Sequence, residues 1–388
     1  MPTSALRDHA NFFCGFALCL ALTACSSNNP PIICAAPASS NNSTAVCTCG
    51  GPGVAACPVM AGPEFLYAYN NGQILPLSID RDSGALTALS PVPGPAISLG
   101  MTAVNNQFLY VSDFQTAQLY GYGINQTTGA LTALANSPFS TGTLSAPSGL
   151  ASPTNNSLLY AGDAGVDTFA ISASGVPTLI PPPPLSSGAD LFVTVDPSGL
   201  FLYASDDDAP GGISAFTIGS SGALTPVQGS PFTNPGQTVA NSRPAGIVDT
   251  GAFIYTALTD ANQVAAFSFA NGTGALTPVP GSPFPAGVSP SAVVFANGLL
   301  YVLNGGSISG YSVNLTTGAL TPLAASPFAI VGGSMATDYL GGYLYVSGIS
   351  GIQAFAINTA NGALTPLSGS PFGASGARLM TMVQIPPP

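Results

Sequence analysis

The chain has 388 residues, of which only 5% are charged, and its formal net charge is −11. It contains no Lys, a single Glu (Glu64) and a single His (His9). Proteins that hold phosphate backbones need clustered Lys and Arg, so this composition excludes nucleic-acid binding. Hydrophobic residues make up 46% of the sequence, which supplies enough apolar surface for a folded core and argues against intrinsic disorder.

Residues 1–24 are predicted to be an export signal. Arg7 precedes an apolar stretch, residues 12–22, that is too short to span a bilayer and has the length of a signal-peptide core. This stretch leads into Leu-Thr-Ala-Cys at 22–25, which resembles the lipobox of bacterial lipoproteins and implies lipidation of Cys25. An ordinary cleaved signal followed by an unrelated Cys is the alternative. Ser26 follows Cys25, and by resemblance to lipoproteins of bacteria with two membranes this favours an outer-membrane anchor. The predicted location is the cell envelope, facing the periplasm or the surface.

Residues 25–62 read as a tether rich in Asn, Ser, Pro and Ala. Outside the signal and beyond Cys25, every cysteine of the chain lies in this tether, at Cys34, Cys47, Cys49 and Cys57. An even set of cysteines in an exported segment predicts two disulfides, for which three connectivities are open. A metal site is the other interpretation, and the lack of a nearby His in an oxidising compartment weighs against it.

From residue 63 onward one pattern recurs seven times. It begins with a short aromatic strand whose last residue is Tyr, at Tyr67, Tyr110, Tyr160, Tyr203, Tyr255, Tyr301 and Tyr345. A second apolar strand follows in each copy. The 3.6-residue periodicity of helical repeats is absent, and a repeat of roughly 40–50 residues has the length of a four-stranded propeller blade.

Each copy continues with a tight turn and an outer strand. The turn carries Gly-Ala-Leu-Thr, starting at Gly84, Gly129, Gly222, Gly274, Gly318 and Gly362, with Gly175-Val176-Pro177-Thr178 in the third copy. Gly supplies the positive φ that such a hairpin turn needs. Five copies then end in Ser-Pro-Phe, where Pro suits an edge strand and Phe is expected to pack between blades. This motif starts at Ser137, Ser230, Ser282, Ser326 and Ser370.

The first copy lacks the strand that precedes the aromatic strand in the later copies. Residues 378–385, at the other end of the chain, have the pattern of that missing strand. We therefore predict an all-β fold, a seven-bladed β-propeller over residues 63–388 with four-stranded antiparallel blades. The C-terminal strand is expected to join the first blade and close the ring, which hides sheet edges that would otherwise aggregate.

This pattern resembles the lactonase-type seven-bladed propellers, the family of bacterial 6-phosphogluconolactonase and the fungal carboxy-muconate cyclising enzyme. The resemblance is carried by the segment 196–203, Asp-Pro-Ser-Gly-Leu-Phe-Leu-Tyr, and by the recurrent Thr-Gly-Ala-Leu-Thr and Ser-Pro-Phe. Enzymes of this family carry a Pro-Arg-His-like element on their inner strands. The corresponding residues here hold no His or Arg, at 147–149, 190–192, 244–246 and 290–292.

Two functions are consistent with these residues. Opening a lactone needs a base and a donor for the oxyanion. Without His or Lys the base would be an Asp, which is weak at neutral pH unless burial raises its pKa. The first hypothesis is an exported, lipid-anchored monomer that binds a small molecule, glycan or protein at a propeller face and has degenerate catalytic positions. The second is a lactone hydrolase of the 6-phosphogluconolactonase-related family acting on an exported lactone. Neither requires a cofactor, and the membrane is contacted only through the lipid.

By resemblance to other propellers, the loops between second and third strands share one face with the connections between blades. The first set of loops holds or adjoins Asp113, Asp163, Asp206, Asp207, Asp208 and Asp260, and the second set ends in Arg243 and Arg378. One interpretation is a ligand site in which the arginines bind a carboxylate and the three consecutive aspartates hold Ca²⁺. The other is that each Arg pairs with a nearby Asp and the acidic loops are solvated. Four other aspartates, Asp80, Asp82, Asp249 and Asp338, are expected to cap turns.

Overall fold

The computed structural model describes residues 32–35, 46–49, 62–140, 147–154, 156–163, 165–181, 190–206, 212–233, 244–270 and 272–386. It divides the chain into two units, residues 1–62 with 386–388 and residues 63–385. In the first unit, β1 (Ile32–Ala35) pairs antiparallel with β2 (Val46–Cys49), and the register sets Cys34 opposite Cys47. Cys25, Cys57 and the export signal lie outside the described residues, and the disulfides stay a prediction.

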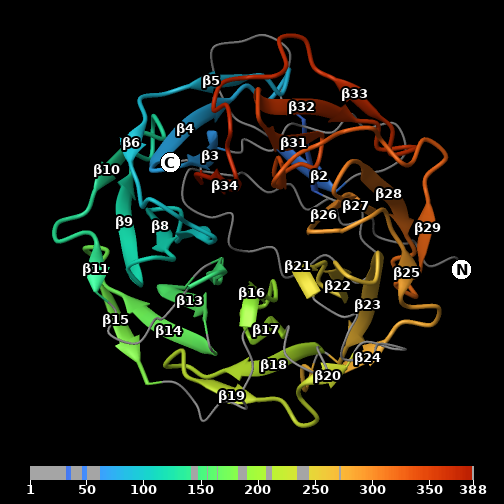
Figure 1. Cartoon of the computed structure of the whole chain (residues 1–388), viewed down its shortest axis with the longest axis horizontal. Coiled ribbons are helices and arrows are strands. Elements are labelled where there is room, and N and C mark those ends of the chain that lie inside the picture. The colour runs from blue at the N-terminus through green and yellow to red at the C-terminus, as the bar shows by residue number, and fades with distance from the viewer. Residues whose placement is uncertain are drawn as a thin grey trace, which may run out of the picture. The chain divides into compact units, whose positions relative to one another are not determined.

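The second unit contains seven antiparallel sheets in the described part of the chain. Figure 1 shows them arranged around a central axis, with the first strand of each sheet innermost. We number the sheets as blades in chain order. From innermost to outermost strand, blade 1 is β34 (Leu379–Gln384), β3 (Glu64–Asn70), β4 (Gln73–Ile79) and β5 (Leu86–Ala88); blade 2 is β7 (Met101–Val104), β8 (Phe108–Asp113), β9 (Gln118–Ile124) and β10 (Leu131–Ala133); blade 3 is β12 (Leu150–Ala151), β13 (Leu158–Gly162), β14 (Val166–Ile171) and β15 (Pro177–Ile180); blade 4 is β16 (Asp190–Val195), β17 (Phe201–Asp206), β18 (Gly212–Ile218) and β19 (Leu224–Pro226); blade 5 is β21 (Pro244–Asp249), β22 (Phe253–Leu258), β23 (Gln263–Phe269) and β24 (Leu276–Pro278); blade 6 is β26 (Ala292–Ala296), β27 (Leu299–Leu303), β28 (Ile308–Val313) and β29 (Leu320–Pro322); and blade 7 is β30 (Met335–Thr337), β31 (Tyr343–Gly348), β32 (Gly351–Ile357) and β33 (Leu364–Pro366).

The C-terminal strand closes the ring. β34 pairs antiparallel with β3 along six residue pairs, from Glu64 opposite Gln384 to Tyr69 opposite Leu379. This confirms the prediction that the last strand supplies the innermost position of the first blade. The first and last described strands of the propeller are thus held in one sheet, and neither leaves an open edge at the seam.

The repeated tyrosine of the aromatic strand, which lies inside the second strand of each blade, links its blade to the next. Its hydroxyl donates a hydrogen bond of 2.6–3.3 Å to the carbonyl of the turn glycine in the following blade. The pairs are Tyr67–Gly129, Tyr110–Gly175, Tyr160–Gly222, Tyr203–Gly274, Tyr255–Gly318, Tyr301–Gly362 and Tyr345–Gly84. Because the last pair returns to blade 1, the series runs around the whole ring.

The turn glycine is required for two reasons. All seven have φ between 69° and 87°, a region that other L-residues rarely adopt. Space is also lacking, since a Cβ on Gly129 would lie 2.2 Å from the Phe65 ring of the preceding blade. The predicted positive φ is confirmed. Asn also adopts positive φ, but its Cβ would collide with the neighbouring blade, so only Gly fits at this position.

The outer strand of five blades differs from the prediction. It does not end in Ser-Pro-Phe; instead it stops earlier and the Phe begins a second short pairing with the same third strand, at Phe139, Phe232, Phe284, Phe328 and Phe372. The serine of the motif fills the gap, because its Oγ accepts a bond of 2.8–3.0 Å from a third-strand N–H. The five phenylalanines belong to apolar clusters that span two successive blades, as predicted.

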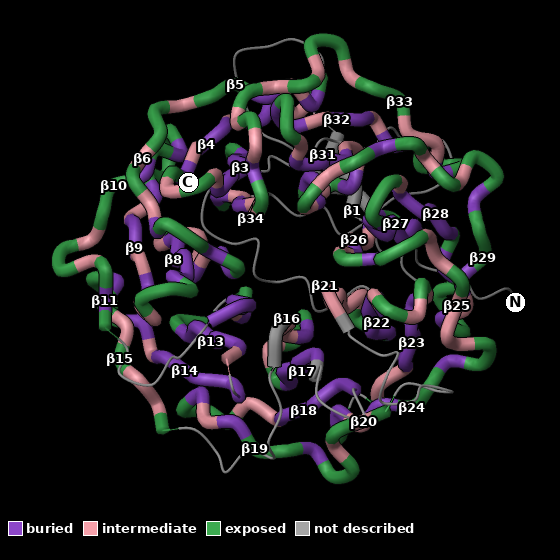
Figure 2. The backbone as a smooth tube through the Cα atoms, viewed as in Figure 1, coloured by how far each residue is buried: buried purple, intermediate pink, exposed green. Residues whose placement is uncertain are grey.

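The core lies between the blades. Figure 2 shows that the buried backbone follows the second and third strands, while the outer strands and turns are exposed. Both faces of these middle strands pack against neighbouring sheets, which explains their nearly continuous apolar sequence. Among the described residues, no helix has the length and apolarity needed to cross a membrane.

Candidate functional site

The ring has two ends that differ in what they hold. We call one end of the ring the turn face: it holds the turns that join the first strand of a blade to the second, and the third strand to the fourth. The opposite end, where second strands turn into third strands and the chain passes between blades, is the loop face. The predicted catalytic positions and ligand residues belong to the loop face, so it is described first.

Two of the positions at which the resemblance would place catalytic residues, Phe192 and Gly246, use their backbone in hydrogen bonds to the second strand of the same blade. At the start of β16, Ser205 Oγ accepts a hydrogen bond from Phe192 N at 3.0 Å, and at β21 Thr256 Oγ1 donates to Gly246 O at 3.1 Å. A Cβ on Gly246 would lie 2.8 Å from Ala292 Cα, on the neighbouring inner strand. Neighbouring inner strands thus approach too closely at β21 to admit a large side chain, and a catalytic His at this place would need the backbone to shift.

The predicted ligand residues of the loop face have separate surroundings. Asp113 is buried and caps its own loop, because its carboxylate accepts from Gln115 N at 2.9 Å and from Thr116 Oγ1 at 2.7 Å. Asp163 lies in the tight turn between β13 and β14, where its N–H donates to Gly165 O. Asp260 is exposed in the turn between β22 and β23.

Arg378 is exposed just before β34, and its N–H donates to Tyr69 O at 2.9 Å. Burial raises the pKa of Tyr69, while the Arg378 charge lowers it and the Asp113 charge raises it. Both charges therefore act on one hydroxyl of the loop face. Asp206 ends β17 opposite Gly212 and Asp190 in the register; Asp207, Asp208 and Arg243 lie outside the described residues.

A metal centre is not formed by the residues that the structure describes, since no three His, Cys, Asp or Glu side chains gather there in a way that could hold an ion. The Ca²⁺ prediction depends on three consecutive aspartates, Asp206–Asp208, of which two lie in a gap of the description. It stays a prediction.

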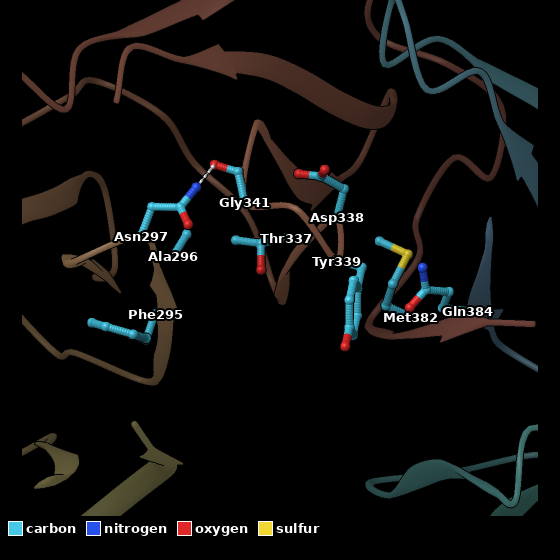
Figure 3. Close-up of a pocket in the computed structure, with 9 residues that line it drawn as sticks. All are labelled: Phe295, Ala296, Asn297, Thr337, Asp338, Tyr339, Gly341, Met382 and Gln384. Carbon is cyan, nitrogen blue, oxygen red and sulfur yellow. Dashed lines mark hydrogen bonds between the residues drawn. The ribbon is translucent and has the colours of Figure 1, made fainter. Parts of the chain in front are cut away.

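The turn face carries a pocket of about 420 Å³. It is built from the ends of three neighbouring inner strands, β26, β30 and β34, and from the turns that follow the first two. Figure 3 shows the side chains of Phe295 and Asn297 on one side and those of Tyr339, Met382 and Gln384 on the other. The lining residues are Phe295, Ala296, Asn297, Thr337, Asp338, Tyr339, Gly341, Met382 and Gln384.

The turn that follows β30 is fixed by hydrogen bonds of its own residues and of blade 6. The Asp338 carboxylate accepts from Tyr343 N at 2.6 Å and from Leu340 N at 3.2 Å, which confirms its predicted role as a turn cap. Burial raises the pKa of Asp338, and these backbone donors oppose the shift. From blade 6, Asn297 Nδ2 donates to Leu340 O at 2.7 Å. The pocket wall is therefore held in place before any ligand arrives.

Glu64 and Arg81 complete this wall. Glu64 is only 2% exposed, and its Oε1 accepts from Tyr339 N at 3.0 Å and lies 3.7 Å from Arg81 Nη2. Burial raises the pKa of Glu64, while the Arg81 charge lowers it. The one glutamate of the chain thus orients the backbone of Tyr339, a pocket residue.

No family model matches the sequence, and no curated protein matches it. Several solved structures are similar to this one in fold. A candidate 6-phosphogluconolactonase from Bacteroides fragilis superposes with a TM-score of 0.69 and 18% identity over 84% of this chain and 99% of that one. The periplasmic gluconolactonase of Pseudomonas aeruginosa gives 0.67 and 17% over 84% and 100%. The fold is that of the lactonase-type propellers. At these identities the likeness extends to the fold alone.

One carboxylate of this propeller has surroundings that the sequence did not reveal. Asp249 was predicted to cap a turn, and its Oδ1 does accept from Gly251 N at 2.6 Å. Its position in the register, opposite Ile254, is that of Val195 in blade 4 and Phe295 in blade 6. It therefore occupies a packing position between blades.

Burial is the largest influence on the pKa of the Asp249 carboxyl group. Its Oδ2 is buried and has no hydrogen-bond partner among the described residues. Burial raises the pKa of Asp249 to about 7, the Gly251 N–H lowers it, and the nearby Asp196 charge raises it. The signal that could have found it is the register of the repeat, which aligns this Asp with apolar residues of other blades.

Proposed function

We propose that this protein is a binding module that keeps the lactonase-type propeller fold without residues able to hydrolyse a lactone. The observation that carries the proposal is the use of Glu64. It is the only Glu in the chain, and its carboxylate is engaged by Tyr339 N and Arg81. With no Lys, and with its single His at position 9 inside the predicted signal, the propeller has only aspartates left as general bases.

The aspartates support the same conclusion. Asp113 and Asp338 accept hydrogen bonds from their own turns, so these carboxylate oxygens hold the backbone and are engaged in place of a water that a general base would activate. Asp249 has a pKa near neutrality, which suits a general base. Its Oδ2 is buried, however, and so does not reach a bound substrate.

We infer in the same way that the protein is exported and anchored to the cell envelope through a lipid on Cys25. The supporting features are the signal-like residues 1–24 and the Leu-Thr-Ala-Cys that ends at Cys25. The ligand in this setting is a small molecule, a glycan or a protein, held at a propeller face by a monomer that needs no cofactor. In the tether, the register that sets Cys34 opposite Cys47 favours a disulfide between them.

A hydrolase acting on an exported lactone is the second candidate. What favours it is the structural likeness to a protein described as a periplasmic gluconolactonase. Arg378 on the loop face would supply the positive charge for the oxyanion in that case.

The test is an assay of the purified, exported protein on a panel of five- and six-membered lactones. We expect hydrolysis at the uncatalysed rate. Turnover above that rate contradicts the binding-module proposal, and its loss in Arg378→Gln together with its retention in Asp82→Asn would place the reaction on the loop face. Asp82 serves as the control because it is a turn residue at the opposite end of the ring.

A further inference from the structure

We propose that the turn-face pocket binds a neutral pyranose sugar, one that carries neither phosphate nor carboxylate. The inference rests on the proposed function, because it assigns a site and a ligand class to the binding module. The pocket volume of about 420 Å³ lies within the range of roughly 300–1,000 Å³ that is typical of small-molecule sites.

Three neutral polar groups of the pocket are left unpaired by the part of the protein that the structure describes. The Thr337 hydroxyl, the Tyr339 hydroxyl and the Gln384 amide make no hydrogen bond with the described residues, and all three line the same space. Asn297 adds a carbonyl oxygen, since its Nδ2 is engaged by Leu340 O. Hydroxyls and amides both donate and accept, as sugar hydroxyls do, so each can pair with a hydroxyl without a change in charge.

The apolar groups of the pocket suit the apolar C–H face of a sugar ring. Phe295 and Met382 face the pocket, and the Tyr339 side chain is 69% exposed, although large aromatic side chains are usually buried. An aromatic face carries partial negative charge, and the C–H bonds on one face of a pyranose present partial positive charge to it. An exposed aromatic ring beside free hydroxyls and amides therefore matches a ligand with an apolar face and a hydroxylated rim.

Charge decides against an ionic sugar. The lining residues include no cation, and the Asp338 oxygens are committed to Tyr343 N and Leu340 N. Arg81, the cation of the described chain that lies behind this wall, is paired with Glu64. A phosphate or carboxylate in the pocket would lose its hydration without gaining a partner, and the net charge of −11 would oppose its approach.

The closed ring itself assembles the pocket. Met382 and Gln384 belong to β34, the strand that joins the first blade, whereas Phe295 and Asn297 come from blade 6. Glu64 holds Tyr339 N from the start of β3. Such pre-ordering reduces the entropy lost on binding, and it makes Glu64 a positioning residue for the Tyr339 ring.

The experiment titrates the exported protein with methyl glucopyranoside, methyl mannopyranoside, methyl galactopyranoside and maltose, using saturation-transfer NMR and calorimetry. Glucose 6-phosphate, glucuronate and the uncharged, capped peptide N-acetyl-Gly-Ala-Gly-amide are the comparison ligands. We expect at least one neutral sugar to bind and the three comparison ligands to bind more weakly or not at all.

Variants then place the binding. Tyr339→Phe and Gln384→Ala should each weaken it about 3- to 10-fold, as expected for one hydrogen bond, and Tyr339→Ala should weaken it further. Gln73→Ala is the matched control, because Gln73 is an exposed glutamine at the opposite end of the ring, and it should bind as the parent does. Unchanged unfolding midpoints show that the variants are folded.

Four outcomes overturn the inference: no sugar bound at millimolar concentration, binding unaffected by the Tyr339 and Gln384 variants, an ionic sugar bound as well as a neutral one, or the peptide bound in place of the sugars. None of these outcomes depends on the result of the lactone assay. Lactone turnover overturns the binding-module proposal instead, so the two failures are distinguishable.

Discussion

Two carboxylates of the turn face, Glu64 and Asp249, lie at different seams of the ring and have different partners. At the seam between blades 7 and 1, Glu64 accepts from a backbone N–H and faces Arg81 at 3.7 Å. Between blades 4 and 5, Asp249 accepts a hydrogen bond from one N–H and lies near a second carboxylate, Asp196. Its Oδ2 is buried and has no hydrogen-bond partner among the described residues. Burial raises the pKa of both.

The difference shows what a partner does for a buried charge. A carboxylate removed from water is stable when a cation and hydrogen bonds replace the water, and otherwise it takes up a proton. At the ring-closing seam, the Arg81 charge compensates the Glu64 carboxylate. Glu64 in turn holds the backbone of Tyr339 in the pocket wall. The seam between blades 4 and 5 supplies a second negative charge, which leaves Asp249 to titrate near neutral pH.

The largest test removes the ring-closing seam altogether. A chain that ends at Gly373 lacks β34, so β3 gains an open edge and blade 1 loses its innermost strand. We expect loss of cooperative unfolding, measured by circular dichroism during heating. A chain that lacks only residues 386–388 is the control and should unfold as the parent does. A cooperative transition at the parental midpoint in the shorter chain would contradict ring closure.

The next test separates the two seams by pH. The pKa of Asp249 in the folded state, about 7, exceeds the ordinary 3.8, so between these values the folded chain holds a proton that the unfolded chain lacks. This carboxyl therefore makes stability fall as pH rises from about 4 to 7, by on the order of 2–4 kcal/mol. Asp249→Asn should be more stable than the parent above pH 7, and urea unfolding at pH 5 and pH 8 measures the effect. An equal pH dependence in both proteins would refute it.

Removing the cation should make Glu64 resemble Asp249. Arg81→Met leaves a 2% exposed carboxylate with one backbone donor, and we expect a loss of about 1–3 kcal/mol at pH 7. The loss should shrink towards pH 4, because the pKa of Glu64 rises further without Arg81 and the group becomes protonated. Adding Glu64→Gln should recover part of the stability, as measured in a double-mutant cycle. Additive effects of the two changes would show that the pair does not interact.

The smallest test compares the tyrosine bonds of the same two seams. Tyr345→Phe and Tyr203→Phe each leave a buried glycine carbonyl without its donor and should cost about 1 kcal/mol. Tyr345 Oη lies 3.0 Å from Gly84 O, whereas Tyr203 Oη lies 3.3 Å from Gly274 O. We therefore expect the larger loss at the ring-closing seam, by a few tenths of a kcal/mol in urea unfolding. The reverse order would indicate that this distance does not govern the seam.

The repeat in the sequence is sufficient to predict the architecture. Repetition of the Tyr-ending strand, the turn glycine and the Ser-Pro-Phe motif predicts blade number and strand order, because each element is encoded within about 50 residues of its partners. The closing strand was found by the same reasoning, as the one element missing from the first copy. Local chemistry also predicted the positive φ of Gly84 and its counterparts and the turn cap at Asp338.

The contacts between blades could be found only from the folded structure. The bond from Tyr345 to Gly84 joins residues 261 positions apart, and the Glu64–Tyr339 bond joins residues 275 apart. No local pattern specifies which polar groups meet across such separations, nor which aspartate loses its water. For this reason the sequence directed attention to the charged loops of one face, whereas the pocket forms at the other face, where the inner strands of blades 6, 7 and 1 converge.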